Sequence, residues 1–234
     1  MNAESAIQYL LKDPLLHMNM LESIQSGSGK LLAAGEDGVL LINTAAEAAM
    51  MSTESAETAA GMLACIPAVP LFVAHQSFYE EAAAQKFGYT HKMVCRQAVY
   101  LKKQPLPIPC GAPAIRPLDG RHLSFIIEHY THADDEAYLI ERLESGAMFG
   151  AFTEDSLAGF IGTHAEGSMG MLEVLPRYRR RGVALALETF LINRLLDCGR
   201  VPFAQIVTDN TASLELQRKL GFAISDKTLS WLMM

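Results

Sequence analysis

The sequence predicts an α/β (α+β) protein in which strands and helices are interleaved. Half of its 234 residues are apolar, which fits a folded, globular chain. Short apolar segments typical of strands alternate with longer segments whose apolar residues recur at helical spacing. After residue 113 the expected order is strand, helix, helix, three strands, helix, strand, helix and strand. Such interleaving favours a sheet covered by helices.

Composition excludes several classes of protein. A net charge of −7 argues against a nucleic-acid binder, because the phosphate backbone favours clustered positive charge. The four cysteines are scattered without the spacing of a zinc site, so we expect reduced thiols, no metal and a cytoplasmic location. The first residues lack the pattern of a signal peptide, and no apolar run is long enough to span a bilayer, so no membrane partner is expected.

The first half predicts alternating elements that end at turn or capping residues. Gly35 to Gly38 provides the turn of a hairpin, and Gly88 closes a helix as a left-handed cap. Ser52 or Thr53 is a plausible cap for an Ala-, Glu- and Met-rich helix. The expected elements are a helix over 6–16 with a bend or restart near Pro14, the hairpin over 30–43, a helix over 53–64, a strand over 69–74, a helix over 76–87 and a strand over 91–101.

Alternate prolines separate the two halves. Residues 103–113 hold four prolines and almost nothing that could pack, a composition that suits a semi-rigid spacer. We therefore expect an N-terminal domain over 1–104, a linker over 105–113 and a catalytic domain over 114–234. The alternative is an ordinary long loop within one domain.

The second half shows the clearest strand and helix patterns. Glu154 to Ser156 is expected to turn a hairpin, and Gly199 to end a long helix. The expected elements are strands over 114–118, 148–152, 157–163, 168–175, 201–208 and 222–232, and helices from 119 or 120 to 129, over 134–145, from 183 to about 198 and over 211–220.

The turn between Pro176 and Val183 has the features of an anion site. Pro176 ends the preceding strand because it has no amide hydrogen to donate. The start of the next helix offers unpartnered N–H groups, Gly182 leaves room beside them, and Arg179 to Arg181 add positive charge. The alternative is a solvated basic turn that only caps the helix.

The pattern Arg179-x-x-Gly182-x-Ala184, followed by Asp209-Asn210, Ser213 and Lys219-Leu220-Gly221-Phe222, resembles the GNAT superfamily of acyl-CoA-dependent N-acyltransferases. The resemblance implies a mixed sheet, flanked by helices, that splays to admit acetyl-CoA or another acyl-CoA with its pyrophosphate on the turn. The residues expected to bind the cofactor are Leu172, Val174, Arg179, Arg180, Arg181, Gly182, Val183, Ala184, Leu185, Asn210 and Ser213. For Asn210 the alternative is a helix N-cap.

A weaker echo of this pattern occurs in the first half. The segment from His75 to Tyr89 is a helix closed by Gly-aromatic after a buried strand, as is the segment from Asp209 to Phe222. We therefore expect two GNAT-like units in tandem, the first degenerate because it lacks the arginine-glycine turn. This layout is similar to glycine N-acyltransferase relatives. The alternative is that helix-Gly-aromatic is only a common capping arrangement.

Three residues are candidates for the general base. Glu173 matches the position of a glutamate that acts through water in many GNAT members, although it can also be a glutamate on a solvated sheet face. His164 and Glu166 end the preceding strand and form the second choice; a lone histidine there is more often structural. Gln217 stands where the family has a tyrosine that protonates the leaving thiolate, and glutamine cannot act as an acid.

These observations predict an N-acyltransferase that moves an acetyl or short acyl group from acyl-CoA to the primary amine of a small molecule. The alternatives are a non-catalytic acyl-CoA-binding sensor or scaffold, favoured by Gln217, and a protein N-acetyltransferase. The expected assembly is a monomer or a homodimer.

Overall fold

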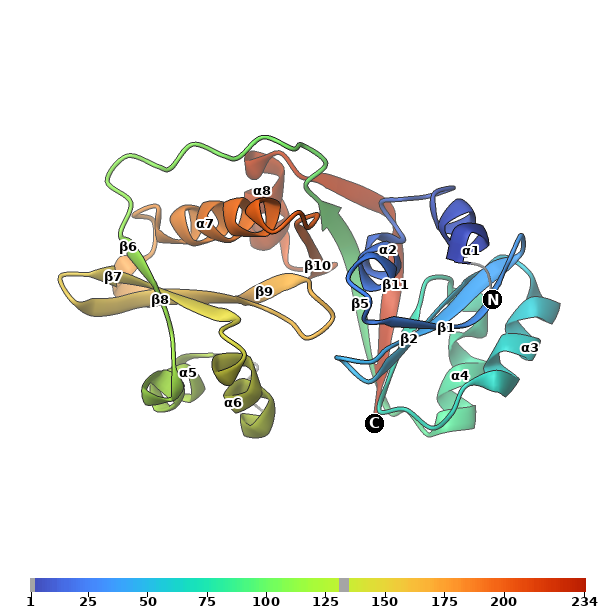
Figure 1. The fold of residues 1–234 in the computed structure, drawn as a ribbon. Coiled ribbons are helices and arrows are strands. Elements are labelled where there is room, and N and C mark those ends of the chain that lie inside the picture. Colours follow the sequence, from blue (N-terminus) through green and yellow to red (C-terminus); the bar gives the residue numbers. More distant parts are fainter. Residues whose placement is uncertain (1–2, 131–134) are drawn as a thin grey trace. The chain divides into compact units, whose positions relative to one another are not determined.

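A computed structural model describes residues 3–130 and 135–234 and divides into two compact units. Unit 1 contains the chain up to Val99 together with Phe203–Met234, and unit 2 contains Tyr100–Pro202 (Figure 1). The expected domains at 1–104 and 114–234 divide the sequence differently, because the last strands of the chain pack in unit 1.

The order helix, helix, three strands, helix, strand, helix, strand occurs twice along the chain. The first set is α1 (Ala3–Leu10), α2 (Met18–Gln25), β1 (Gly29–Gly35), β2 (Gly38–Asn43), β3 (Ala48–Thr53), α3 (Ala56–Cys65), β4 (Leu71–Ala74), α4 (Glu80–Phe87) and β5 (His91–Val99). The second, preceded by β6 (Ala114–Pro117), is α5 (Leu123–His129), α6 (Glu136–Glu144), β7 (Met148–Thr153), β8 (Ser156–Thr163), β9 (Met169–Val174), α7 (Val183–Asp197), β10 (Phe203–Val207), α8 (Thr211–Leu220) and β11 (Ala223–Met233). The mixed α/β class is confirmed, and the echo between the halves extends to this whole order of elements.

The two sets interlock through β11. In unit 1 the strand order is β1-β2-β3-β4-β11-β5-β10, in which β3 and β4 are parallel and the other paired strands are antiparallel. Ser230 of β11 lies opposite Ala74 of β4 on one side and opposite Val94 of β5 on the other. The last strand of the second set therefore completes the sheet of the first.

Helices cover both faces of the sheet in unit 1. On one face Phe72 and Tyr79 belong to a core that includes residues of α3 and α4. On the other face Tyr9 of α1 and Met20 of α2 pack with Trp231 of β11. The contribution of Trp231 shows that β11 supports the core as well as the backbone pairing.

Unit 2 is an antiparallel sheet in the order β9-β8-β7-β6. Helices α5 and α6 lie on one face and α7 on the other (Figure 1). Phe160 of β8 packs with Ile126 of α5 and Leu139 of α6, whereas Phe149 of β7 contacts Phe190 of α7 with ring centroids 5.0 Å apart. Side chains of successive strand residues thus point to opposite faces of the sheet. The face covered by α5 and α6 carries the site described below.

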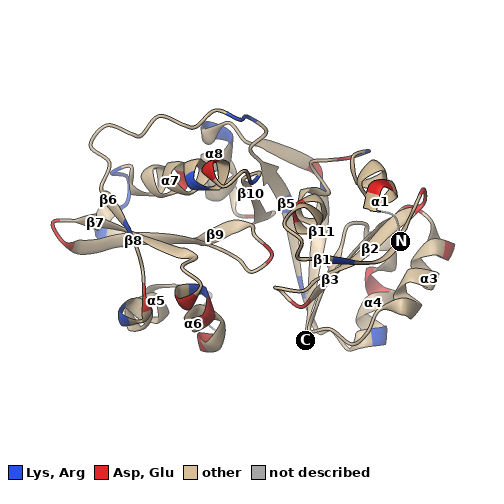
Figure 2. Cartoon of the chain, in the orientation of Figure 1, with Lys and Arg blue, Asp and Glu red and all other residues tan. Residues whose placement is uncertain are grey.

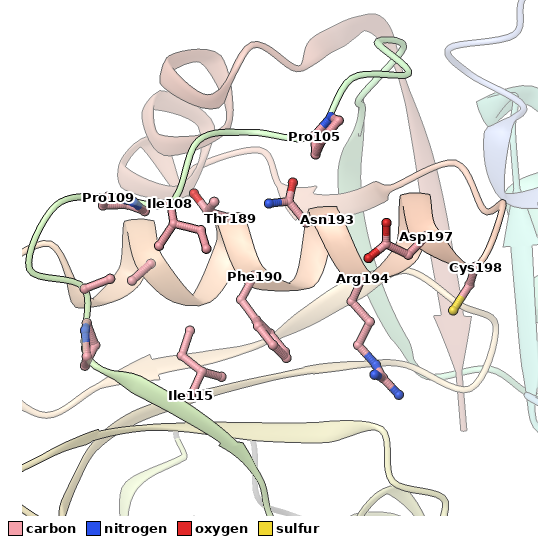
Figure 3. A pocket seen from close by; sticks show the side chains of 13 residues that line it. Pro105, Ile108, Pro109, Ile115, Thr189, Phe190, Asn193, Arg194, Asp197 and Cys198 are labelled. Carbon is pink, nitrogen blue, oxygen red and sulfur yellow. The ribbon is translucent and has the colours of Figure 1, made fainter.

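The proline-rich segment lies on the outer face of α7. Asn193 donates to the carbonyl oxygen of Leu106 at 2.9 Å and accepts from its N–H at 2.7 Å. Between the segment and the helix is a cavity of about 630 Å³, partly lined by Ile108 and Phe190 (Figure 3). The expectation that almost nothing in this segment packs was wrong, because one amide side chain on α7 satisfies both backbone groups of Leu106.

Two details of the first half differ from the expected elements. The helix expected over 6–16 ends at Leu10, and the chain restarts as α2 after Pro14, which is the restart expected there. The cap expected at Ser52 or Thr53 for the next helix was wrong. Residues 48–53 form β3, so α3 begins only at Ala56, with the Ser55 hydroxyl accepting from the N–H of Thr58 at 3.2 Å. Ala and Met favour helices locally, but every residue of β3 is buried between helices on both faces, and this packing decides the structure.

Most other elements are confirmed to within a few residues. Gly88 and Gly221 adopt the expected left-handed conformation after α4 and α8, and Gly199 has a φ of 71° after α7. The described part of the chain has free cysteines at all four positions. None of its helices is long and apolar enough to cross a membrane.

A layer of buried polar side chains lies within unit 1. His75, 2 % exposed, places Nδ1 2.9 Å from the carbonyl oxygen of Met51 and Nε2 2.9 Å from Oδ1 of Asn19. Burial, reinforced by the charge of nearby His17, lowers the pKa of His75 from 6.5 to about 3. The folded protein therefore keeps this ring neutral at acidities where the unfolded chain has already bound a proton.

We predict that truncation to residues 114–234 prevents stable folding, because β11 loses both of its neighbours and β10 loses β5. The isolated piece should show no cooperative thermal transition by circular dichroism. Coexpression with residues 1–113 should restore one. A monomeric fragment 114–234 that unfolds cooperatively would contradict this interlocked sheet.

We also predict that acid destabilises the protein through His75. Below pH 6.5 the unfolded chain binds a proton at His75 that the folded protein binds only near pH 3. The free energy of unfolding therefore decreases as the pH is lowered from 6.5 to about 3, and this loss of stability is absent above pH 6.5. In urea titrations, the difference in unfolding free energy between the parent and His75→Gln should shrink by up to about 1.4 kcal/mol for each pH unit below 6.5. Parallel pH dependences for the two proteins would rule out this role for His75.

Candidate functional site

A bulge in β9 distinguishes the middle of this strand. Phe160 lies opposite Glu173 and Gly162 lies opposite Gly170. Between these two pairs β9 advances by three residues and β8 by two, so β9 contains one extra residue. Met171 adopts a φ of 53°, which is uncommon for a residue with a side chain. Bulges bend a strand and redirect its side chains, and they are frequent beside active sites. Glu173, opposite Phe160, lies on the α5/α6 face.

The turn from β9 to α7 leaves backbone N–H groups free of helical partners. Gly182 caps α7 in the left-handed conformation, with φ 79° and ψ 3°. The N–H of Ala186 makes the first helical bond, to the carbonyl of Gly182 at 2.9 Å, so the N–H groups of Val183, Ala184 and Leu185 precede the helical ladder. A Cβ on Gly182 would meet no atom of the described residues within 4 Å, so glycine is required by backbone conformation while the space beside it is open.

The three arginines of this turn differ in their contacts. Arg179 donates from Nε to the carbonyl oxygen of Val174 at 2.9 Å, and from Nη2 to Oε1 of Glu173 at 3.2 Å. Arg180 and Arg181 are exposed, and Arg180 has a φ of 63°. Figure 2 shows Lys and Arg positions in blue in the loop that leads to α7. Arg179 therefore connects the end of β9 to the turn, and its two neighbours present their charge to solvent.

Glu173 is held in a defined position. Its side chain is 18 % exposed, and Oε1 accepts from the N–H of Val174 at 3.1 Å as well as from Arg179. Tyr130, which follows α5, contacts the ring of Phe160 at 6.1 Å between centroids. Burial raises the pKa of Tyr130, and the negative charge of Glu173 acts in the same direction. The Tyr130 phenol therefore lies close enough to the Glu173 carboxylate for the two to interact electrostatically.

His164 and Glu166 occupy the turn between β8 and β9 but have separate partners. Nδ1 of His164 lies 3.0 Å from the hydroxyl of Tyr138 on α6, and the two rings stack at 13°. The same hydroxyl accepts from the N–H of Ala165 at 3.2 Å. Glu166 is 7 % exposed and accepts from the hydroxyl of Ser168.

The imidazole of His164 lies against Gly170 of β9. A Cβ on this glycine would come within 2.4 Å of Nε2, so only glycine admits the ring there. Burial, with the charge of Glu166, raises the pKa of Tyr138 well above its usual value, which keeps the phenol protonated. Tyr138 therefore fixes the orientation of His164.

The remaining predicted residues lie in two places. Leu172 is half-buried and Val174 buried in β9 of unit 2, whereas Asn210 and Ser213 begin α8 in unit 1. Oδ1 of Asn210 accepts from the N–H of Ser213 at 3.1 Å, so the helix-cap alternative is confirmed. A contact of Asn210 with pantetheine stays a prediction. Gln217 is buried in the same helix.

Sequence reasoning missed Tyr130 and Tyr138. Both flank the connection between α5 and α6, far in sequence from β9, and nothing in their local pattern distinguishes them from ordinary aromatic core residues. Only the packing of α5 and α6 on the sheet brings these phenols to Glu173 and His164. Within residues 3–130 and 135–234, no group of three His, Cys, Asp or Glu side chains is placed to hold a metal ion.

Comparison with protein families gives a match between residues 147–232 and the model described as FR47-like protein. This segment runs from the start of β7 almost to the end of β11 and contains the bulged strand, the arginine turn and α7. Comparison with curated proteins gives no significant match.

Three solved structures are similar over nearly the whole chain. A Drosophila protein has a TM-score of 0.70 and 14 % identity, covering 99 % of this chain and 95 % of its own. A GCN5-related N-acetyltransferase-like protein from Streptococcus suis has a TM-score of 0.55 and 12 % identity, with coverages of 98 % and 100 %. A GCN5-related N-acetyltransferase from Sphaerobacter thermophilus has a TM-score of 0.53 and 15 % identity, with coverages of 99 % and 92 %. At these identities the likeness shows the fold alone.

Proposed function

The C-terminal half of the chain carries an FR47-like GNAT domain, and from this premise we propose that the protein transfers an acetyl or other short acyl group from acyl-CoA to the primary amine of a small molecule. The observation that carries the proposal is the turn before α7, where N–H groups ahead of the helical ladder lie beside exposed arginines. That combination is suited to a diphosphate.

In this proposal the turn holds the diphosphate of CoA. The N–H groups of Val183, Ala184 and Leu185 donate to phosphate oxygens, and Arg180 and Arg181 supply positive charge. The backbone of Leu172 to Val174 runs alongside the pantetheine arm as an added-strand contact. The acyl-CoA, as co-substrate, supplies the activated thioester.

Glu173 is the proposed general base. Acyl transfer requires the amine to lose a proton, its nitrogen to bond to the thioester carbon, and the carbon–sulfur bond to break. Arg179 and the N–H of Val174 both engage Oε1 of Glu173, which orients the carboxylate to accept the proton through a water. Because Gln217 cannot donate a proton as an acid, the leaving thiolate takes its proton from solvent.

His164 is the second candidate base. Tyr138 holds one ring nitrogen, which leaves Nε2, above Gly170, as the nitrogen that can exchange a proton with an acceptor. A non-catalytic acyl-CoA-binding module is the alternative function, and Gln217 is the observation that favours it. Release of free thiol from acetyl-CoA in the presence of a panel of primary amines distinguishes catalysis from binding alone.

We predict that Arg180→Ala weakens CoA binding about tenfold, because it removes one charged contact to the diphosphate. Gly182→Val should weaken it at least as much, since valine is strained at a φ of 79°. Calorimetry with CoA measures both, with Arg218→Ala, an exposed arginine of α8, as the matched control. Unchanged affinity in both turn variants, with thermal unfolding also unchanged, would remove the turn from the binding site.

Glu173→Gln is expected to lower turnover by about 10²–10⁴-fold while leaving the affinity for CoA intact. Glutamine can still accept from Val174, so the strand should keep its structure. Steady-state rates and their pH profile test this. If the profile of the variant overlays that of the parent, the base is another group, and His164→Gln becomes the variant to measure.

A further inference from the structure

A second cavity, of about 350 Å³, lies wholly within unit 1. Its walls come from α1 and the residues after it, the β1–β2 turn, the starts of the connections after β3 and β4, and β11. We propose that this cavity binds a small organic cation, a primary amine or a guanidine. This site does not depend on the function proposed for unit 2.

The position of the cavity in the sheet is the first support. Strands β3 and β4 are the parallel pair of unit 1, and their ladder ends at Met51 and Ala74. Glu54 and Ser55 follow β3, Gln76 follows β4, and all three line the cavity. Ligands of α/β proteins characteristically bind outside the carboxyl ends of parallel strands, where the connections diverge.

The floor of the cavity is a preorganised polar layer. His17, 4 % exposed, places Nδ1 3.0 Å from the carbonyl oxygen of Leu10 and Nε2 2.8 Å from the hydroxyl of Ser52. That hydroxyl also accepts from Nε2 of Gln76 at 3.0 Å and lies 3.3 Å from the hydroxyl of Tyr9. Because each of these side chains is fixed by its neighbours, the floor can bind a ligand without first being ordered.

The side chains at the ends of β3 and β4 do not suit the binding of acyl-CoA in this unit. Gln76 bridges the two strands past the end of their ladder, since Oε1 accepts from the N–H of Thr53 at 3.0 Å while Nε2 donates to Ser52. Glu54 precedes α3 where Arg181 stands before α7, so a diphosphate here would meet a carboxylate. The cavity therefore suits a ligand different from acyl-CoA.

The charges around the cavity select a cation. The charged lining consists of Asp13, Glu36, Asp37, Glu54, Lys12 and Lys227. Lys227 pairs with Asp13 at 3.1 Å, and Lys12 donates to the backbone oxygen of Glu36 at 2.9 Å. Within the described residues, no ion pair engages the carboxylates of Glu36, Asp37 or Glu54, so the cavity carries net negative charge.

Two of these carboxylates act on the floor itself. Burial raises the pKa of Tyr9, and the negative charges of Glu54 and Asp37 act in the same direction. Their field therefore reaches the phenol beside Ser52. The ammonium of Lys12 lies 4.9 Å from the centroid of the Tyr9 ring. A ligand ammonium or guanidinium elsewhere in the cavity would replace solvent as the counter-charge of Glu54 and Asp37.

Calorimetry with agmatine and putrescine on the full chain, without CoA, tests the proposal. We expect saturable binding of at least one of them and none of L-glutamate. Glu54→Gln should weaken that binding about tenfold, the value of one charged contact. Glu57→Gln, an exposed carboxylate of α3 outside the cavity, is the matched control and should bind as the parent does.

The proposal is overturned if neither cation binds up to about 10 mM, or if Glu54→Gln binds as tightly as the parent. Equal weakening by Glu57→Gln would also overturn it, because the effect would then be one of general charge. Thermal unfolding of each variant confirms that the fold is kept. Arg180→Ala should bind the cation normally, so failure of the CoA turn and failure of this cavity are distinguishable.

Discussion

The guanidinium of Arg179 is the interaction on which the candidate site depends. It joins the carbonyl of Val174, at the end of β9, to the carboxylate of Glu173, and it does so from within the turn that leads to α7. Arg179 therefore links the expected general base, Glu173, directly to the turn expected to bind the anion. Arg179 makes these contacts although its side chain is 59 % exposed, and Arg180 and Arg181 beside it are exposed as well.

The two sets of elements share an order but differ in what they can hold. The set that ends in β11 contains the arginine turn and a bulged strand, whereas the first has Glu54 before its helix and a polar layer from His17 to Gln76 at the end of its parallel strands. The same order of elements therefore carries the proposed anion site in one unit and the proposed cation site in the other. Because β11 of the second set lies between β4 and β5 of the first, the two sets cannot be separated without breaking the sheet of unit 1.

Sequence reasoning worked where local chemistry decides the structure. The helix-ending glycines at 88, 199 and 221, the hairpin turns and the helix over 211–220 follow from conformational preference alone. It did not predict β3, whose residues are buried on both faces, and it failed at Asn193, whose contact with Leu106 spans more than eighty positions. The phenols of Tyr130 and Tyr138 were missed for the same reason, since only tertiary packing brings them to the site.

The proposed function requires the turn between β9 and α7 to bind the diphosphate of coenzyme A. A crystal structure of the protein with coenzyme A bound tests this most directly. Density for the diphosphate is expected against the N–H groups of Val183 to Leu185, with Arg180 or Arg181 in contact. Coenzyme A bound elsewhere, with the bend occupied only by solvent, would contradict it.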